Sequence, residues 1–392
     1  MKVPMSSPDI SAEDIQAVHA VLATPYLSMG PRILDFEQRF ARYIGVSHAA
    51  GVSSGTSGLH LAVITTGIGN GDLAITTPFS FISSANCLLY ERATPLFVDI
   101  DPETLNVDAS LVAEAARDLA RGGKAARPWL PPALQHRADS PGDLKAILAV
   151  DVFGQPADYD SLRRTAREYG LVLVEDACEA IGAEYKGRRA GTLGDVAVFA
   201  FYPNKQMTTG EGGVVVTDRK EWDTLFRSLR NQGRDESGTW LNHVRLGYNY
   251  RLDEMSAALG LSQLARIDEL LQKRERVARM YGEHLRRVER VTAPVVAPTT
   301  TRQSWFVYVV RLAPDVDRQA IMARLHEQGI ACRPYFTPIH LQPFYVERFG
   351  YRPGSFPVTE AVSQSTLALP FHGELDEETV ALVCKTLREA CA

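Results

Sequence analysis

The fold is decided by residues 171–218, which read LVLVEDACEAIGAEYKGRRAGTLGDVAVFAFYPNKQMTTGEGGVVVTD. This stretch holds three short apolar runs, at 171–177, 195–201 and 212–218, with turn residues between them. Runs that are almost continuously apolar and rich in β-branched residues are typical of strands buried on both faces of a sheet. The stretch therefore predicts three buried strands, with polar side chains where the strands end.

The same pattern extends toward the N-terminus and predicts one large sheet. Four further apolar runs alternate there with segments of helix length, at 49–54, 72–77, 95–100 and 145–152. This alternation predicts an α/β fold in which helices cover a mixed, mostly parallel, seven-stranded sheet. Amphipathic helices are predicted at 11–23, where Ser11 and Asp14 form a capping-box pattern, and at 33–44. Residues 121–143, rich in proline, glycine and charge, predict an irregular surface loop.

A second, smaller α/β domain is predicted after residue 250. A long helix from about 252 to 288 bridges the two domains, because Leu264, Ile267 and Leu271 share one helix face. Beyond it the pattern predicts a strand at 303–312, a helix near 316–328, an extended piece at 331–335 and a final helix near 375–390. We therefore expect a large cofactor-binding domain at 1–250 and a small domain at 251–392.

Composition bounds the class of protein. The chain has 392 residues, enough for two or three domains, and its 45% hydrophobic and 23% charged residues are ordinary for globular proteins. The 42 Lys and Arg against 47 Asp and Glu give a net charge of −5, which disfavours binding of nucleic acid or an anionic membrane. No apolar stretch approaches the roughly 20 residues that span a bilayer. The five scattered cysteines, without CxxC or HExxH spacing, favour reduced thiols and no metal site, so we expect a soluble cytoplasmic protein.

Two ionisable side chains directly follow predicted strands. Asp176 ends the run 171–177, at the carboxyl edge of the sheet, where open α/β sheets bind ligands. A buried carboxylate there needs a cationic or proton-donating partner. Lys205 follows the run 195–201 in a turn rich in threonine and glycine. It is either a solvated surface charge or, when buried, a neutral amine that can form an imine.

A third group follows the first predicted strand. Ser54 leads through Gly55, Thr56, Ser57 and Gly58 into a helix whose unpaired N–H groups can hold a phosphate. Taken alone, the segment is better explained by Thr56 or Ser57 capping the helix. Taken together, a phosphate-ready helix end, a strand-end aspartate and a strand-end lysine are what pyridoxal phosphate requires: an anchor, a partner for the ring nitrogen and a Schiff-base amine. This combination predicts a pyridoxal phosphate enzyme.

Two glycine-rich motifs are less informative. GVSSG (51–55) matches the G-x-S-x-G nucleophile elbow and offers a hydrolase at Ser53 as an alternative. An elbow normally follows several strands, whereas two predicted helices precede the first strand here, which disfavours this alternative. GIGNG (67–71) runs into a strand instead of opening a helix, so it predicts a turn and no dinucleotide site.

Segments along nearly the whole chain match one known family. They are GPRILDFEQRFARYIG (30–45), SSGTSGLHLAV (53–63), TTPFSFISSANCLLY (76–90), PLFVDIDPETLNVD (95–108), VFGQPADYD (152–160), EDACEAIGAEYKGRRAGTLGDVAVFAFYPNKQMTTGEGG (175–213), NQGR (231–234), LGYNYRLDEMSAALGLSQL (246–264) and RPYFTPIHLQPFY (333–345). With these segments in this order, the chain resembles the sugar aminotransferases of the DegT/DnrJ/EryC1/StrS family. These are pyridoxal phosphate enzymes of fold type I.

The resemblance implies roles for the two strand-end residues and shows two departures. Lys205 matches the Schiff-base lysine and Asp176 the partner of the ring nitrogen. Relatives with histidine in place of this lysine are sugar dehydratases, so Lys205 favours transamination. Glu179 stands where the family commonly has glutamine beside the ring hydroxyl, so it is either protonated or turned away. Ala200 stands where the family often has a phosphate-binding serine, so another donor must compensate.

The resemblance also implies how the rest of the cofactor is held. Gly55, Thr56 and Ser57 match the residues that bind the phosphate. Phe81 matches an aromatic residue that stacks on the ring; the alternative is an ordinary core phenylalanine. Asn249 matches an asparagine that reaches the cofactor phosphate of the neighbouring subunit. A homodimer with shared active sites follows.

The reaction implied by the resemblance is a ping-pong transfer of an amino group. The donor is glutamate or glutamine, and the acceptor is a keto-sugar, usually nucleotide-linked, with a keto-cyclitol as the alternative. The candidate cations for a diphosphate, unless they form structural salt bridges, are Arg234, Arg251, Arg333 and His340. Residues 121–143 either shape the sugar pocket or are a surface insertion. A non-catalytic regulatory paralogue is a further alternative, against which the intact cofactor residues argue.

Overall fold

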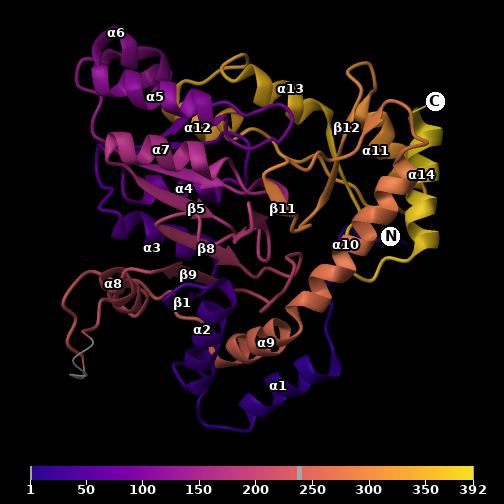
Figure 1. Cartoon of the computed structure of the whole chain (residues 1–392), viewed down its shortest axis with the longest axis horizontal. Helices are drawn as coiled ribbons and strands as arrows, with labels where there is room; N and C mark the ends of the chain where they lie inside the picture. The colour runs from indigo at the N-terminus through magenta and orange to yellow at the C-terminus, as the bar shows by residue number, and fades with distance from the viewer. Residues whose placement is uncertain (1, 236–240, 392) are drawn as a thin grey trace.

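A seven-stranded sheet forms the centre of the chain (Figure 1). The computed structural model describes residues 2–235 and 241–391. In sheet order the strands are β1 (His48–Val52), β9 (Gly213–Thr217), β8 (Val196–Ala200), β5 (Val172–Asp176), β4 (Leu144–Val150), β2 (Leu73–Thr76) and β3 (Thr94–Phe97). β9 is antiparallel to both of its neighbours and the other pairs are parallel. The predicted mixed, mostly parallel sheet of seven strands is therefore confirmed.

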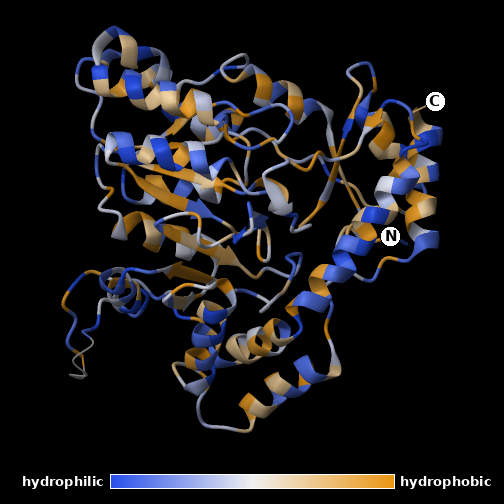
Figure 2. Cartoon of the chain, viewed as in Figure 1, coloured by the Kyte–Doolittle hydropathy of each residue, from blue (hydrophilic) through white to orange (hydrophobic). Residues whose placement is uncertain are grey.

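Helices bury both faces of this sheet. They are α3 (Gly55–Thr65), α4 (Ser83–Tyr90) and α8 (Lys220–Arg230) on one face, and α2 (Pro31–Ile44), α5 (Ala109–Arg121) and α7 (Tyr159–Tyr169) on the other. Along β4, Leu148 and Val150 pack in the apolar cluster under α3, α4 and α8, and Ile147 and Ala149 pack in the cluster under α5 and α7. Because successive strand residues point to opposite faces, burial on both sides requires an apolar residue at nearly every position. The central strands are accordingly orange in Figure 2.

The N-terminal segment carries the helix α1 (Ala12–Leu22), which packs on α9 (Glu254–Ala265). The predicted capping box is present, since Asp14 N–H donates to Ser11 Oγ at 3.2 Å and Ser11 N–H donates to Asp14 Oδ2 at 2.9 Å. Residues 67–71 form the predicted turn, in which Gly67 and Gly71 have positive φ.

The C-terminal part has its own core around a small sheet. Its strands are β10 (Val291–Thr292), β12 (Tyr308–Leu312) and β13 (Thr366–Leu369), with β12 in the centre. Its helices are α10 (Ile267–Leu285), α11 (Arg318–Glu327), α12 (Pro343–Phe349), α13 (Pro357–Ser365) and α14 (Glu377–Cys391). Side chains of α10, α11 and α14 pack on β12 and β13 in a separate apolar cluster. This arrangement is the predicted smaller α/β part.

Three predicted elements differ from the structure. The helix expected over 252–288 is interrupted at Arg266, which separates α9 from α10. The extended piece expected at 331–335 is not a strand and makes only an isolated bridge between Arg333 and Ala368. Residues 121–143 are not irregular but hold the short helix α6 (Gly123–Ala126) and two 3-10 helices, Arg127–Trp129 and Pro132–Arg137. Proline fits the first turn of a helix, where its missing N–H costs nothing.

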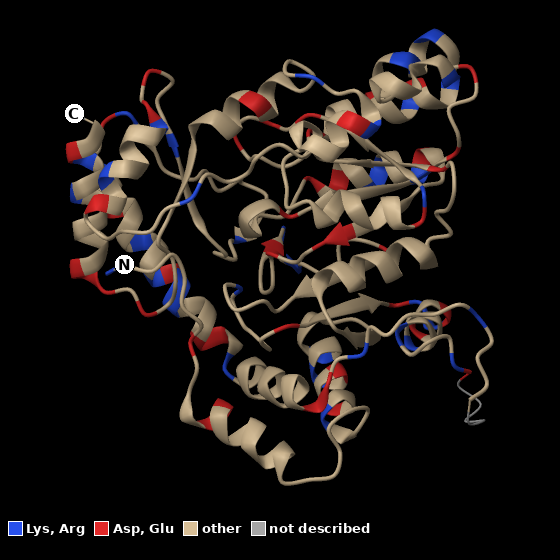
Figure 3. Cartoon of the chain, turned by 180° about the vertical axis from the view of Figure 1, so that it is seen from behind, with Lys and Arg blue, Asp and Glu red and all other residues tan. Residues whose placement is uncertain are grey.

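A further small sheet joins the two parts of the chain. It has the order β11-β6-β7, formed by β11 (Thr300–Arg302), β6 (Glu184–Tyr185) and β7 (Arg188–Arg189). Acidic and basic residues are interspersed over the helices, as Figure 3 shows from behind. Within residues 2–235 and 241–391, none of the helices has the length and apolar character needed to cross a bilayer.

Candidate active site

A cavity of about 450 Å³ lies at the carboxyl ends of β5 and β8. Its wall includes Asp176, Lys205 and the first turn of α3 with Gly55 and Thr56. The sheet topology brings these groups together. β5 and β8 are parallel neighbours. β1, which leads into α3, and β8 are both antiparallel to β9, so β1 and β8 run in the same direction. The three strands therefore end at one edge of the sheet. The volume lies within the range of small-molecule sites.

Asp176 is a buried carboxylate with neutral partners. It is 4% exposed, and its Oδ2 accepts a hydrogen bond from Ser84 Oγ at 2.8 Å. Its Oδ1 accepts from the Cys178 N–H at 3.2 Å. Among the described residues, no cationic side chain lies within 4.0 Å of this carboxylate. A buried carboxylate on a cavity wall without a cation has room for a proton-donating ligand atom.

The Lys205 side chain is largely buried and faces two groups inside the cavity, so it is not a solvated surface charge. Its Nζ lies 3.7 Å from the centroid of the Phe306 ring and 3.6 Å from Glu179 Oε1. Glu179 is turned toward this amine, and its Oε2 accepts a hydrogen bond from the Phe153 N–H at 2.9 Å. Burial raises the pKa of Glu179, and the nearby Lys205 ammonium opposes that rise.

The N-terminus of α3 is capped by Ser54. Its Oγ accepts from the Ser57 N–H at 3.1 Å, and Ser57 Oγ accepts from the Ser54 N–H at 2.9 Å. The Ser57 hydroxyl is therefore used in the cap and is not among the residues of the cavity wall, and its role toward the phosphate stays a prediction. Thr56 Oγ1 instead lies on the wall, 2.8 Å from Ser83 Oγ. The first N–H groups of the helix remain without intrahelical acceptors.

Gly55 lets α3 approach β8 closely. A Cβ placed on Gly55 would lie 2.7 Å from Ala200 Cβ and 3.0 Å from Cys178 Sγ. Ala200, the position that departs from the family serine, therefore packs directly against the helix turn. Ser83 supplies a hydroxyl to the same wall beside Thr56.

Of the predicted site residues that remain, only Phe81 lies on the cavity wall. Phe81 borders the cavity with 62% of its surface exposed, so it is not a core phenylalanine. The residues that lie off this wall within the described chain are Asn249, Arg234, Arg251 and Arg333, together with all of 121–143. Asn249 is exposed and pairs through its backbone with Asn231, to whose Oδ1 Arg251 Nη1 donates at 3.0 Å.

The predicted site residue His340 is buried and paired with a carboxylate. Its side chain is 0% exposed, and its Nε2 lies 3.0 Å from Glu360 Oε1. Burial lowers the pKa of His340, and Glu360 opposes that effect. His340 is thus buried, paired within the C-terminal part and not among the residues of the cavity wall, so its role toward a substrate diphosphate stays a prediction.

Sequence reasoning missed several residues of the cavity wall. They are Ser83, Ser84, Phe306, Tyr335 and Phe336. Ser83 and Ser84 lie in the family segment 76–90, so their hydroxyls were detectable there. Phe306 lies two residues before β12, and no sequence signal connects it to Lys205.

For the hydrolase alternative, residues 2–235 and 241–391 place no histidine or carboxylate within hydrogen-bond distance of the Ser53 hydroxyl. The Ser53 hydroxyl lies 3.1 Å from the Ser57 hydroxyl, which cannot take its proton as a histidine would. Ser53 is also off the cavity wall.

The cavity fits pyridoxal phosphate. Asp176 is a buried carboxylate that lacks a cation, Lys205 offers an amine inside the cavity, and α3 offers free N–H groups beside the Thr56 hydroxyl. These groups correspond to the ring nitrogen, the aldehyde and the phosphate of that cofactor.

Comparison with known proteins agrees with this chemistry. The model of the DegT/DnrJ/EryC1/StrS aminotransferase family matches residues 8–388. The chain belongs to this family. It is a pyridoxal phosphate-dependent sugar aminotransferase with the type I fold.

Individual relatives match over nearly their full length. A GDP-perosamine synthase of Caulobacter vibrioides is 36% identical over 98% of this chain and 97% of its own. The spore coat polysaccharide biosynthesis protein SpsC of Bacillus subtilis is 33% identical, over 99% and 96%. DesV from S. venezuelae, whose crystal structure is in complex with a ketimine intermediate, is 34% identical, with a TM-score of 0.84 over 96% of this chain and 94% of that one.

Proposed function

We propose that this chain transfers the amino group of glutamate or glutamine to a nucleotide-linked keto-sugar in amino-sugar biosynthesis. The observation that carries the proposal is the meeting of Lys205, Asp176 and the N-terminus of α3 on one cavity wall. The GDP-perosamine synthase that shares 36% of its residues supports a GDP-linked sugar as the first acceptor to test.

Each group on the wall has a proposed role. When bound, pyridoxal phosphate supplies an aldehyde that takes up the amino group and a protonated ring that withdraws electrons. Lys205 Nζ holds the cofactor in the resting enzyme and, once released, moves a proton to and from the substrate carbon. Asp176 keeps a proton on the ring nitrogen, because an opposite charge nearby favours the charged form. Gly55 and Thr56 bind the phosphate through backbone N–H groups and a hydroxyl.

Glu179 and Phe81 orient what enters the cavity. Glu179, held by the Phe153 N–H, places a carboxyl group beside the Lys205 amine. Burial raises the pKa of Glu179, and a carboxyl group that takes up a proton does not repel the ring hydroxylate. The exposed Phe81 ring offers a surface on which the cofactor ring stacks.

We propose that the active enzyme is a cytoplasmic homodimer whose subunits complete each other's sites. Leu241, Val244 and Leu246 are exposed in the segment 241–246, and a group of exposed apolar side chains is typical of an interface. Asn249 lies just beyond these residues, and its proposed role is to reach the cofactor phosphate of the neighbouring subunit. Arg234, Arg251 and Arg333 are the proposed cations for the sugar diphosphate. The proposed units are a cofactor-binding domain at 1–250 and a small domain at 251–392.

The proposal is tested with the purified chain, loaded with pyridoxal phosphate. Glutamate or glutamine should convert its absorption to that of the amine form, and a keto-sugar should reverse the change. A panel of GDP-linked and other nucleotide-linked keto-sugars, with a keto-inositol, then identifies the acceptor. Lys205→Ala should abolish turnover. The proposal fails if Lys205→Ala completes many turnovers, or if only the keto-inositol is aminated.

A further inference from the structure

Arg274 in α10 is a buried arginine whose hydrogen bonds all go to backbone carbonyls. It is 4% exposed, and within the described residues no carboxylate lies within 4.0 Å of its guanidinium. Burial lowers the pKa of Arg274 to about 10, so it is still mostly charged at neutral pH. A buried charge without a counter-ion is costly unless hydrogen bonds satisfy it.

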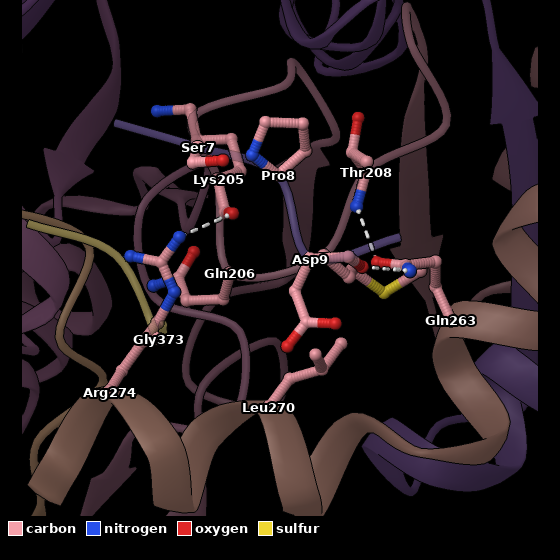
Figure 4. A pocket seen from close by; sticks show the side chains of 11 residues that line it. Ser7, Pro8, Asp9, Lys205, Gln206, Thr208, Gln263, Leu270, Arg274 and Gly373 are labelled. Carbon is pink, nitrogen blue, oxygen red and sulfur yellow. Dashed lines mark hydrogen bonds between the residues drawn. The ribbon is translucent and has the colours of Figure 1, made fainter. Parts of the chain in front are cut away.

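The guanidinium joins two segments of the cavity. Its Nη2 donates to the carbonyl of Lys205 at 2.8 Å and to that of Asn204 at 3.3 Å. Its Nη1 donates to the carbonyl of Phe306 at 3.1 Å and to that of Trp305 at 3.3 Å. Figure 4 shows the Arg274 side chain rising from α10 toward the Lys205 carbonyl.

These two segments carry the two partners of one contact inside the cavity. Lys205 Nζ lies 3.7 Å from the centroid of the Phe306 ring. The Arg274 guanidinium therefore holds the backbone of Lys205 and the backbone of Phe306, the two residues whose side chains are in contact. Arginine suits this task, because its donors form a rigid fork, whereas lysine offers a single point of contact.

A second link follows the same path. Gln206 Nε2 donates to Ser304 Oγ at 2.8 Å, so the residue after Lys205 is tied to the approach to β12. Ser304 N–H donates in turn to the Gly154 carbonyl at 3.1 Å. The Lys205 turn is thus bound at two points to the C-terminal part of the chain, and Arg274 is the point nearest the amine.

We propose that Arg274 is a positioning residue that sets the place of the Lys205 amine over Phe306 and so couples the C-terminal part to the reacting centre. The proposal rests on the proposed role of Lys205. Without the fork, the Lys205 turn and the Phe306 segment shift independently, and the amine loses its fixed direction. Misplacement of a reacting group by about 1 Å can cost about 100-fold in rate.

The test uses the full chain with Arg274→Met and Arg274→Lys. The control is Arg276→Met, because Arg276 lies on the same helix and its Nη2 donates to the carbonyls of Gly373 at 3.0 Å and Leu375 at 3.4 Å instead of those of Lys205 and Phe306. Thermal unfolding checks the fold. The first readout is the rate at which trinitrobenzenesulfonate labels Lys205 in the cofactor-free protein, measured by peptide mass spectrometry. The second is kcat and KM of the loaded enzyme.

We expect Arg274→Met to label Lys205 about 10-fold faster and to lower kcat about 10- to 100-fold, with KM within about 2-fold. Arg274→Lys should show a smaller change in the same direction, and it decides the matter if Arg274→Met does not fold. Arg276→Met should leave both readouts within about 2-fold of the wild type. A folded Arg274 variant that behaves like Arg276→Met overturns the proposal.

The same experiment separates this inference from the proposed function. If the wild-type chain does not carry the cofactor on Lys205, the proposed function fails regardless of Arg274. If the wild type carries it there and Arg274→Lys matches the wild type in labelling and kcat, the positioning role alone fails.

Discussion

Gly55 shows how one missing side chain shapes the cavity. A Cβ there would lie 2.7 Å from Ala200 Cβ, so Gly55→Ala must push the first turn of α3 away from β8. Overpacking of this kind costs about 1–3 kcal/mol, and if this cost falls on the cofactor site, the affinity for pyridoxal phosphate weakens about 5-fold or more. Absorption titration measures it. Gly69→Ala is the control, since nothing lies within 4 Å of its Cβ, and equal affinities in both variants would contradict this account.

The sheet-edge position of the strand-end residues was predictable, whereas the contacts that their partners make with them were not. Asp176 and Lys205 follow apolar runs whose burial the sequence pattern indicates, so their place at the sheet edge follows from the fold. Phe306 and Ser84 reach the same cavity from elements far along the chain, and such contacts arise only from tertiary packing. Ser57 was assigned to the phosphate because a hydroxyl in a first helical turn is compatible with both cap and ligand.

The cap of α3 separates these two roles by experiment. Ser57→Ala removes the hydroxyl that accepts from the Ser54 N–H, and we expect the free energy of unfolding to fall by about 1 kcal/mol. Thr56→Ala should instead weaken binding of pyridoxal phosphate more than Ser57→Ala does, since Thr56 lies on the cavity wall. Urea unfolding and absorption titration report the two effects. The reverse ranking in the titration would favour Ser57 over Thr56 as the phosphate ligand.

The break between α9 and α10 is a tertiary feature that helix propensity cannot reveal. Arg266, where the helix is interrupted, donates through Nη1 to Asp9 Oδ1 and through Nη2 to Asp14 Oδ2, both at 2.9 Å. Lys273 Nζ donates to Asp9 Oδ2 at 2.7 Å. The N-terminal segment is therefore held to both helices by one carboxylate network, which no local pattern near residue 266 shows.

Acid should loosen this attachment. Burial opposes ionisation of Asp9, but hydrogen bonds from Lys273 and Arg266 outweigh it and lower its pKa to about 2. A carboxyl group with a lowered folded-state pKa adds stability above its ordinary value near 4, and this is lost as the pH falls toward 2. The range from about pH 5 to pH 2 covers the pKa of Asp9 in both the unfolded and the folded chain. Across this range, the free energy of unfolding should fall more steeply for the wild type than for Asp9→Asn. Urea unfolding across this range measures both, and parallel curves would argue against the network.

At the scale of the whole molecule, the exposed apolar segment predicts a dimer. Leu246 is 85% exposed in the single chain, and such a side chain gains stability when a partner covers it. Leu246→Asp should weaken the dimer, which light scattering over a range of concentrations measures as a lower mass. It should also reduce aminotransferase activity, which an assay of the same samples measures. Leu382→Asp, on the exposed side of α14, is the control and should leave the mass unchanged. A monomeric wild-type enzyme with full activity would contradict the shared site.

The central claim is that Lys205 carries the cofactor, and one measurement tests it most directly. The purified chain is loaded with pyridoxal phosphate, reduced with borohydride, digested and mapped by mass spectrometry. The account predicts a single modified peptide with the added mass on Lys205. An adduct on another side chain, or none at all, would contradict it.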